Sequence, residues 1–156
     1  MAALFVVAGC SAPQPVVQTG TAPKPVAFRF HLESLTGEIK SDTLVCEFMG
    51  KNDVVILDPD VHFTTTDIES MTATKKSDGV YQVAVFLKDS NKTKLIELSR
   101  LKPARKLALW WDGIIVDRIA FAKTYKSARI ILDRPIPEEW VMAWKSGLPG
   151  VTVTIK

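Results

Sequence analysis

Hydrophobic and polar positions alternate along much of the chain, as they do in β-strands with one buried face. In the segment VAFRFHLES, apolar residues alternate with charged or polar ones. The segments TLVCEFM and DVVILDP are expected to form two further strands, joined by the turn-forming residues 50–53. Three successive strands with short connections predict an antiparallel meander.

A fourth strand and a helix follow in the middle of the chain. Both faces of residues 79–88 are largely apolar, so this strand is expected at the centre of a sheet. Before it, residues 64–73 are expected to contain one short helical turn. After it, leucines repeat every three residues, which predicts a helix that begins at Asp89 or Ser90 and ends before Pro103.

The second half predicts a hairpin, a strand, a helix and a last strand. The pair Asp112-Gly113 in KLALWWDGIIVDRIAF favours a type I′ turn, in which φ is positive. The segment PIPEEWVMAWKSG predicts a helix with Pro137 at its first position and two glutamates in its first turn. Strands and helices that mix without βαβ regularity predict an α+β domain, with a mostly antiparallel sheet and two helices packed on one of its faces.

The beginning of the chain differs from the rest in composition. Residues 1–9 are interpreted as the remnant of a signal peptide, because they are apolar or small and too few to span a bilayer. The tetrapeptide that ends at Cys10 resembles a bacterial lipobox, which implies a lipid on Cys10 that anchors the chain to a membrane. Ser11 after this cysteine favours the outer membrane, by resemblance to enterobacterial sorting. The alternative is that Cys10 is an ordinary small residue of a frayed N-terminus.

Four prolines in residues 10–26 predict an extended tether that does not fold by itself. The remaining residues, 27–156, have the size of one domain. The second cysteine, Cys46, lies in an alternating segment and is expected to be a small buried residue rather than a nucleophile. If Cys10 is acylated, Cys46 has no partner for an intrachain disulfide.

Charge is distributed unevenly along the chain. Residues 1–78 carry six basic and ten acidic residues, whereas residues 79–156 carry fourteen basic and seven acidic ones. The basic half is suited to an acidic partner, anionic lipid or lipopolysaccharide, although a solvated basic surface is the preferred explanation. Nucleic acid is not an expected partner of a secreted lipoprotein.

Four segments of the second half occur in an order that points to a known family. They are TTTDI, the strand-then-helix segment VYQVAVFLKDSNKTKLIELS, the hairpin KLALWWDGIIVDRIAF and the ending ARIILDRPIPEEWVMAWKSGLPGVTVTI. Together they resemble, over residues 53–156, the head subdomain of the large periplasmic domain of SecD, the protein-export accessory membrane protein. The sequence departs from that family at Asp117-Arg118, where the family has a proline, and at Ile136-Pro137, where it has a threonine cap.

The resemblance to SecD implies a fold and at most a capacity to contact extracytoplasmic polypeptide. The proton-coupled work of SecD requires its membrane helices, so that activity is not carried over to this chain.

Few residues suggest chemistry. The sequence contains no G-x-S-x-G motif, phosphate loop or dinucleotide fingerprint. His62 lies near Asp58, Asp60 and Asp67, but no cysteine or second histidine is spaced to complete a metal site, so a solvated loop is the simpler interpretation. His31 is expected on the polar side of its strand. We therefore expect no catalytic residue, cofactor or metal.

Aromatic and basic residues form the best candidate for a binding surface. Trp110 and Trp111 are consecutive on a strand, so their rings are expected on opposite sides of the sheet, one towards the core and one as an exposed anchor. Trp140 and Trp144 lie four residues apart on a predicted helix and are expected in the core. The candidate partner-binding set is Trp110, Trp111, Arg118, Lys123, Lys126 and Arg129.

These observations favour a non-enzymatic envelope lipoprotein that binds a periplasmic protein or peptide, with a link to protein export. Two alternatives stay open. A hydrolase of an envelope substrate would be indicated by Asp58, Asp60, His62 and Asp67 converging in a cleft. An inhibitor or immunity-type lipoprotein would be indicated by a loop that inserts into a partner's active site.

Overall fold

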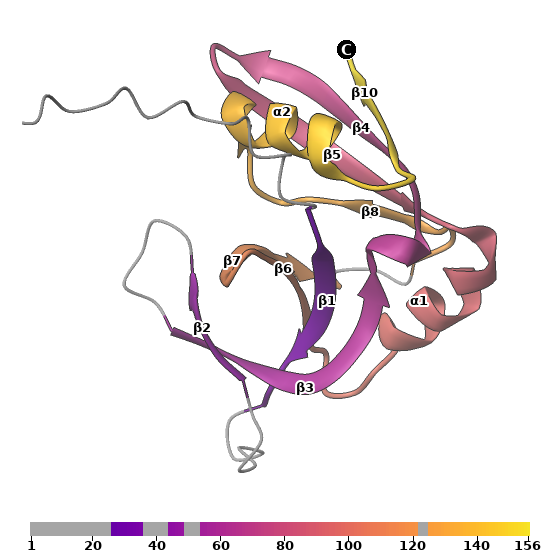
Figure 1. Cartoon of the computed structure of the whole chain (residues 1–156). Coiled ribbons are helices and arrows are strands. Elements are labelled where there is room, and N and C mark those ends of the chain that lie inside the picture. Colours follow the sequence, from indigo (N-terminus) through magenta and orange to yellow (C-terminus); the bar gives the residue numbers. More distant parts are fainter. Residues whose placement is uncertain (1–25, 36–43, 49–53, 122–124) are drawn as a thin grey trace, which may run out of the picture.

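The strands of the domain form two sheets, a closed barrel and an open sheet (Figure 1). The structure, a computed structural model, describes residues 26–35, 44–48, 54–121 and 125–156. In these ranges, no helix is both long and apolar enough to cross a membrane. Residues 10–25, with Cys10, lie outside the described residues, as do the turn at 50–53 and Lys123. Val26, the last residue of the expected tether, instead belongs to the core of the domain, where it is buried and donates its N–H to the carbonyl of Gly147 at 2.9 Å.

The barrel has the strand order β1-β3-β2-β7-β6 and closes through pairing of β6 with β1. Its strands are β1 (Phe28–Glu33), β2 (Leu44–Phe48), β3 (Val54–Thr64), β6 (Lys106–Trp111) and β7 (Ile114–Ala120). Only the pair β2–β7 is parallel among them. The expected meander is wrong in one respect: β3 lies between β1 and β2, because the closed barrel provides β1 with β3 and β6 as its two neighbours.

The open sheet has the order β10-β4-β5-β8, with the short strand β9 beside β5. Its strands are β4 (Ile68–Ser77), β5 (Val80–Leu87), β8 (Arg129–Ile131), β9 (Ile136–Pro137) and β10 (Thr152–Ile155). Strand β5 lies between β4 and β8, as the apolar character of both its faces predicted.

Strand β4 is the element that the sequence pattern failed to predict. Only Thr65–Asp67 form the expected helical turn, a single turn of 3₁₀ helix, and the ten residues after it are extended. A register shift between Ile68 and Ser70 interrupts the alternation of β4 and conceals the strand pattern. Antiparallel pairing with β5 along nearly the whole strand determines its conformation.

Two helices complete the α+β fold that the sequence predicts. Helix α1 (Lys92–Leu98) buries Leu95 and Leu98, and helix α2 (Glu138–Gly147) buries Val141 and Trp144. Pro137 is the N-cap residue of α2 rather than its first helical residue. Figure 1 shows α2 lying across the open sheet and α1 beside the end of β3, so the arrangement differs in detail from one sheet with both helices on one face.

One large core joins the two sheets. It includes Phe28 and Phe30 of the barrel, Val83 and Val85 of the open sheet, and Trp144 of α2. A smaller cluster lies in the barrel around Phe48, Val55, Leu57, Ala108 and Ile115. Because the large core crosses from the barrel to the open sheet, the two sheets bury apolar surface against each other.

The β6–β7 hairpin turns at the predicted residues. Asp112 and Gly113 have φ angles of 48° and 90°. Positive φ at both positions is the geometry of a type I′ turn, whose twist fits the flanking strands.

Candidate partner-binding surface

The two tryptophans of the hairpin belong to different apolar clusters, as their consecutive positions predict. The ring of Trp111 packs edge-on against Trp140 at 4.8 Å and Trp144 at 5.6 Å between ring centroids, beside the large core. The ring of Trp110 packs on the smaller cluster and lies 5.1 Å below the guanidinium of Arg29. Both rings are partly buried, so each contributes to the stability of the fold.

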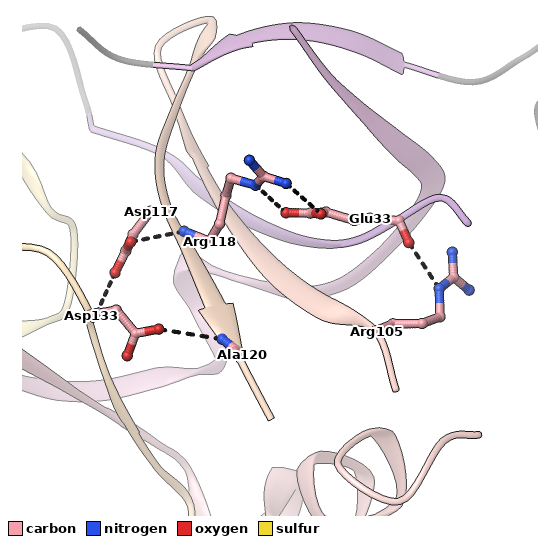
Figure 2. A network of polar contacts seen from close by, with 6 residues as sticks. All are labelled: Glu33, Arg105, Asp117, Arg118, Ala120 and Asp133. Atoms are coloured by element: carbon pink, nitrogen blue, oxygen red, sulfur yellow. Dashed lines mark hydrogen bonds and ion pairs between the residues drawn. The ribbon is translucent and has the colours of Figure 1, made fainter. Parts of the chain in front are cut away.

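Arg118 is part of the wall of the barrel. Its guanidinium donates to both carboxylate oxygens of Glu33, from Nε to Oε1 at 2.5 Å and from Nη2 to Oε2 at 2.9 Å (Figure 2). It also lies 5.6 Å from the ring centroid of Phe48, and the guanidinium of Arg134 lies 4.4 Å from the same centroid. The paired carboxylate neutralises much of the charge of Arg118 within the fold.

Arg105 continues this polar network to the neighbouring strand. Its Nε donates to the carbonyl oxygen of Glu33 at 2.9 Å (Figure 2), and its Nη2 contacts Oδ2 of Asp58 at 3.2 Å. A hollow of about 250 Å³ adjoins the network, and it is lined by Glu33, Ser34, Leu35, Val54, Val55, Ile56 and Arg118.

Asp117 is a buried acid whose importance the sequence pattern did not reveal. It is only 1% exposed, and its carboxylate accepts backbone N–H groups from Arg118 at 2.8 Å, Asp133 at 2.5 Å and Arg134 at 3.2 Å. Burial raises the pKa of this carboxyl, and the three N–H donors act in the opposite direction. Because Asp117 lies on β7 and two of its donors follow β8, it connects the barrel to the open sheet (Figure 2).

Among the residues of the predicted binding set that the structure describes, the exposed ones lie on and before β8. Lys126 and Arg129 are exposed, and the guanidinium of Arg129 lies 5.6 Å from the ring centroid of Phe86. Ile131, two residues further along the strand, is 43% exposed. We call Phe86, Lys126, Arg129 and Ile131 the β8 surface.

A shallow hollow of about 290 Å³ adjoins the β8 surface. It is lined by Glu69, Phe86, Leu87, Asp89, Ser127, Ala128 and Arg129. The β8 surface therefore offers positive charge and apolar area side by side, a combination found in protein-binding sites.

The carboxylates around His62 have separate partners. Asp67 accepts the backbone N–H of Thr64 at 2.8 Å and the side-chain amide of Asn91 at 3.2 Å, whereas Asp58 contacts Arg105. Nζ of Lys94 donates to the carbonyl oxygen of His62 at 2.5 Å. Within the described ranges, no group of three or more His, Cys, Asp or Glu side chains is arranged to hold a metal ion.

His31 is buried, so its expected place on a polar side is wrong. Only 1% of it is exposed, and its Nδ1 lies 3.0 Å from the carbonyl oxygen of Asp58. Register shifts on both sides of His31 in the β1–β3 pairing break the simple alternation that the sequence suggests. Burial lowers the pKa of His31, and it also lowers the pKa of His62.

Cys46 is a partly buried residue of β2. It packs against the smaller barrel cluster, and burial raises the pKa of its thiol. A raised pKa disfavours the thiolate, which is the nucleophilic form. This environment suits a packing residue.

Comparison with known proteins shows which solved fold this chain resembles. No protein-family model matches the chain, and no curated protein sequence is similar to it. A solved structure of SecDF, a membrane component that enhances protein export, superimposes with a TM-score of 0.59 at 13% sequence identity. The match covers 83% of this chain and 64% of that one, so this chain spans less than two thirds of its structural relative. The predicted SecD-like fold is confirmed.

Proposed function

We propose that the protein is a non-enzymatic envelope module that binds an extracytoplasmic protein or peptide and is linked to protein export. The observation that supports this is the SecDF fold, which extends over 83% of the chain. At 13% identity the similarity concerns the fold, so binding, the partner and the link to export are our proposal. The proposal requires no cofactor, metal or nucleic acid.

The proposal includes a lipid anchor. A lipid on Cys10 would hold the domain at the outer membrane, facing the periplasm, and residues 10–25 would separate the domain from the bilayer. Replacing Cys10 by alanine is expected to move the protein from the membrane fraction to the soluble periplasmic fraction and to abolish incorporation of labelled palmitate. A protein that stays in the membrane fraction after this substitution would contradict the anchor.

We propose the β8 surface as the site of contact. Lys126 and Arg129 are exposed and would attract acidic groups, while Ile131 offers apolar area. Trp111 and Arg118, which the sequence placed in the candidate partner-binding set, have partners inside the fold. Their substitution would lower stability as well as binding, so the two losses could not be distinguished.

The test is cross-linking in intact envelopes, followed by purification and mass spectrometry. The charge-reversal pair Lys126→Glu and Arg129→Glu is compared with a matched pair at exposed lysines elsewhere, Lys92→Glu and Lys145→Glu. A reproducible partner that is lost only in the first pair supports the proposal. A partner retained by both pairs would place the site elsewhere. The absence of any partner in all forms would contradict a binding function.

A further inference from the structure

The two edges of the open sheet differ in what they contact. Beyond β8, the backbone N–H groups of Asp133 and Arg134 are bound by Asp117, so this edge continues onto the barrel. At the other edge, β10 pairs with β4, and no other described strand pairs with it. Figure 1 shows β10 on the outer side of the sheet.

The direction of the β10 backbone groups follows from two hydrogen bonds. Lys156 donates its N–H to the carbonyl of Ala73 at 2.9 Å, and its carbonyl accepts the N–H of Lys75 at 3.0 Å. In a parallel pair, alternate residues turn both backbone groups towards the same neighbour. Because Lys156 faces β4, Val153 and Ile155 turn their N–H and C=O groups to the open edge.

The four residues of β10 include no proline, charged residue or bulge that would discourage strand addition. Natural edge strands carry prolines, charged residues or bulges that discourage further pairing. Strand β10 consists of Thr152, Val153, Thr154 and Ile155, which are all β-branched and uncharged. Its register with β4 is regular over all four residues.

Positive charge gathers at one end of the edge. Lys75, Lys76 and Lys156 are all exposed, and Lys75 and Lys156 are joined by the backbone hydrogen bond described above. An acidic residue in an added strand would be attracted to this end.

We propose that β10 binds an extended polypeptide segment as an added strand, with an acidic residue of that segment beside Lys75 and Lys156. Main-chain hydrogen bonds to Val153 and Ile155 would provide binding that depends little on sequence. The inference rests on the proposed function and goes beyond it, because it adds a second site for a polypeptide partner, at the edge of the open sheet opposite the β8 surface.

The test uses the full 156-residue chain and a peptide of alternating valine and threonine with an aspartate at each end. Amide hydrogen exchange, read by NMR, is compared with and without the peptide. We expect new protection at Val153 and Ile155, whereas Thr152 and Thr154 are protected in both states because they already pair with β4. The same peptide with a central proline is expected not to protect them.

Two variants distinguish the contribution of the Ile155 backbone N–H to peptide binding from that of its side chain. Ile155→Pro removes the outward N–H without removing a bond to β4, and Ile155→Ala removes a similar side chain but retains the N–H. We expect peptide affinity to fall by about tenfold in the proline variant and by much less in the alanine variant. An unfolding curve of each variant verifies that both are folded.

Three results would overturn the inference, and each has a different meaning. Peptide binding with protection confined to other residues would place the partner elsewhere and leave the proposed function standing. Protection of Val153 and Ile155 that rises with protein concentration, without peptide, would assign this edge to a second copy of the chain. Failure of the peptide to bind would overturn strand addition, while a partner found by cross-linking would still support the proposed function.

Discussion

Asp117 shows how a single residue can connect two sheets. Its two carboxylate oxygens accept three backbone N–H groups, of which two belong to the segment after β8. A buried carboxylate is costly unless it is hydrogen-bonded, and here the donors come from both sides of the junction. We therefore assign Asp117 a structural role.

Replacing Asp117 by asparagine tests this role. The asparagine side chain has one oxygen that can accept hydrogen bonds, and its NH₂ group replaces the second carboxylate oxygen. At least one of the three backbone N–H groups that Asp117 binds would therefore face another donor and lose its partner. We expect the free energy of unfolding to fall by about 1–3 kcal/mol, measured by urea denaturation. Asp133→Asn is the control, because its carboxylate is exposed, and a change below about 0.5 kcal/mol is expected there. Equal stability of the two variants would argue against the role.

The buried His31 and the half-buried His62 predict a dependence of stability on pH. Burial lowers the pKa of His31 and His62 below 6.5, so the unfolded chain binds protons at a higher pH than the folded chain does. The contribution of the two neutral histidines to the free energy of unfolding is therefore complete above pH 6.5. It is lost as the pH falls through 6.5 towards the pKa that each histidine has in the folded chain. The urea midpoint should decrease between about pH 7.5 and 5.5.

Variants identify the histidine responsible. His31→Gln should flatten the decrease in the urea midpoint, and His62→Gln should do so to a comparable or smaller extent. Asp117 acts in the opposite direction, because its raised pKa lets the folded state take up a proton first, so each variant is compared with the parent at the same pH. An unchanged slope in both variants would contradict the prediction.

At the scale of elements, aromatic packing joins α2 to the barrel. Trp144 of α2 is fully buried and contacts Phe28 of β1 at 5.0 Å and Trp111 of β6 at 5.6 Å between ring centroids. Its indole nitrogen has no hydrogen-bond partner among the described residues. The ring therefore contributes through apolar packing and edge-on contacts rather than through its polar group.

Two substitutions of Trp144 should distinguish the contribution of ring packing from that of the indole N–H. Trp144→Ala is expected to lower the free energy of unfolding by about 3–5 kcal/mol, because it leaves a cavity between the helix and the barrel. Trp144→Phe keeps much of the volume and removes the unpartnered N–H, so we expect a loss below about 1.5 kcal/mol. Chemical denaturation of both variants gives the comparison. Similar losses would indicate that the indole N–H has a partner.

At the scale of the whole molecule, the shared core predicts cooperative unfolding. The large apolar cluster contains residues of the barrel, of the open sheet and of α2, so neither sheet can separate without exposing it. We expect one transition in urea, with coincident midpoints from tryptophan fluorescence and far-ultraviolet circular dichroism. Two separated transitions would show that the barrel and the open sheet are independent folding units.

The proposed function also belongs to this scale. The barrel holds one edge of the open sheet through Asp117, while at the other edge no described strand pairs with the outer side of β10, and Lys126, Arg129 and Ile131 of the β8 surface are exposed. A domain with a shared core and an unpaired sheet edge is suited to binding polypeptide, which is what we propose for this SecDF-like fold.

The sequence by itself determined the elements whose signals are local. Alternation predicted β1 and β5, the pair Asp112-Gly113 predicted the hairpin turn, and the apolar spacing with acidic first turn predicted α2. These features depend on the conformational preferences of a few adjacent residues, so a short segment of sequence is enough to predict them.

Only the tertiary structure decided how these elements combine. The division into a barrel and an open sheet, the strand β4, the burial of His31 and the partners of Asp117 all depend on residues distant in the chain. A strand has two edges, and its local pattern does not specify which strands pair with them. The exposed set at β8 and the open edge of β10 follow from that pairing, so the sequence could name candidate residues but could not show which of them face a partner.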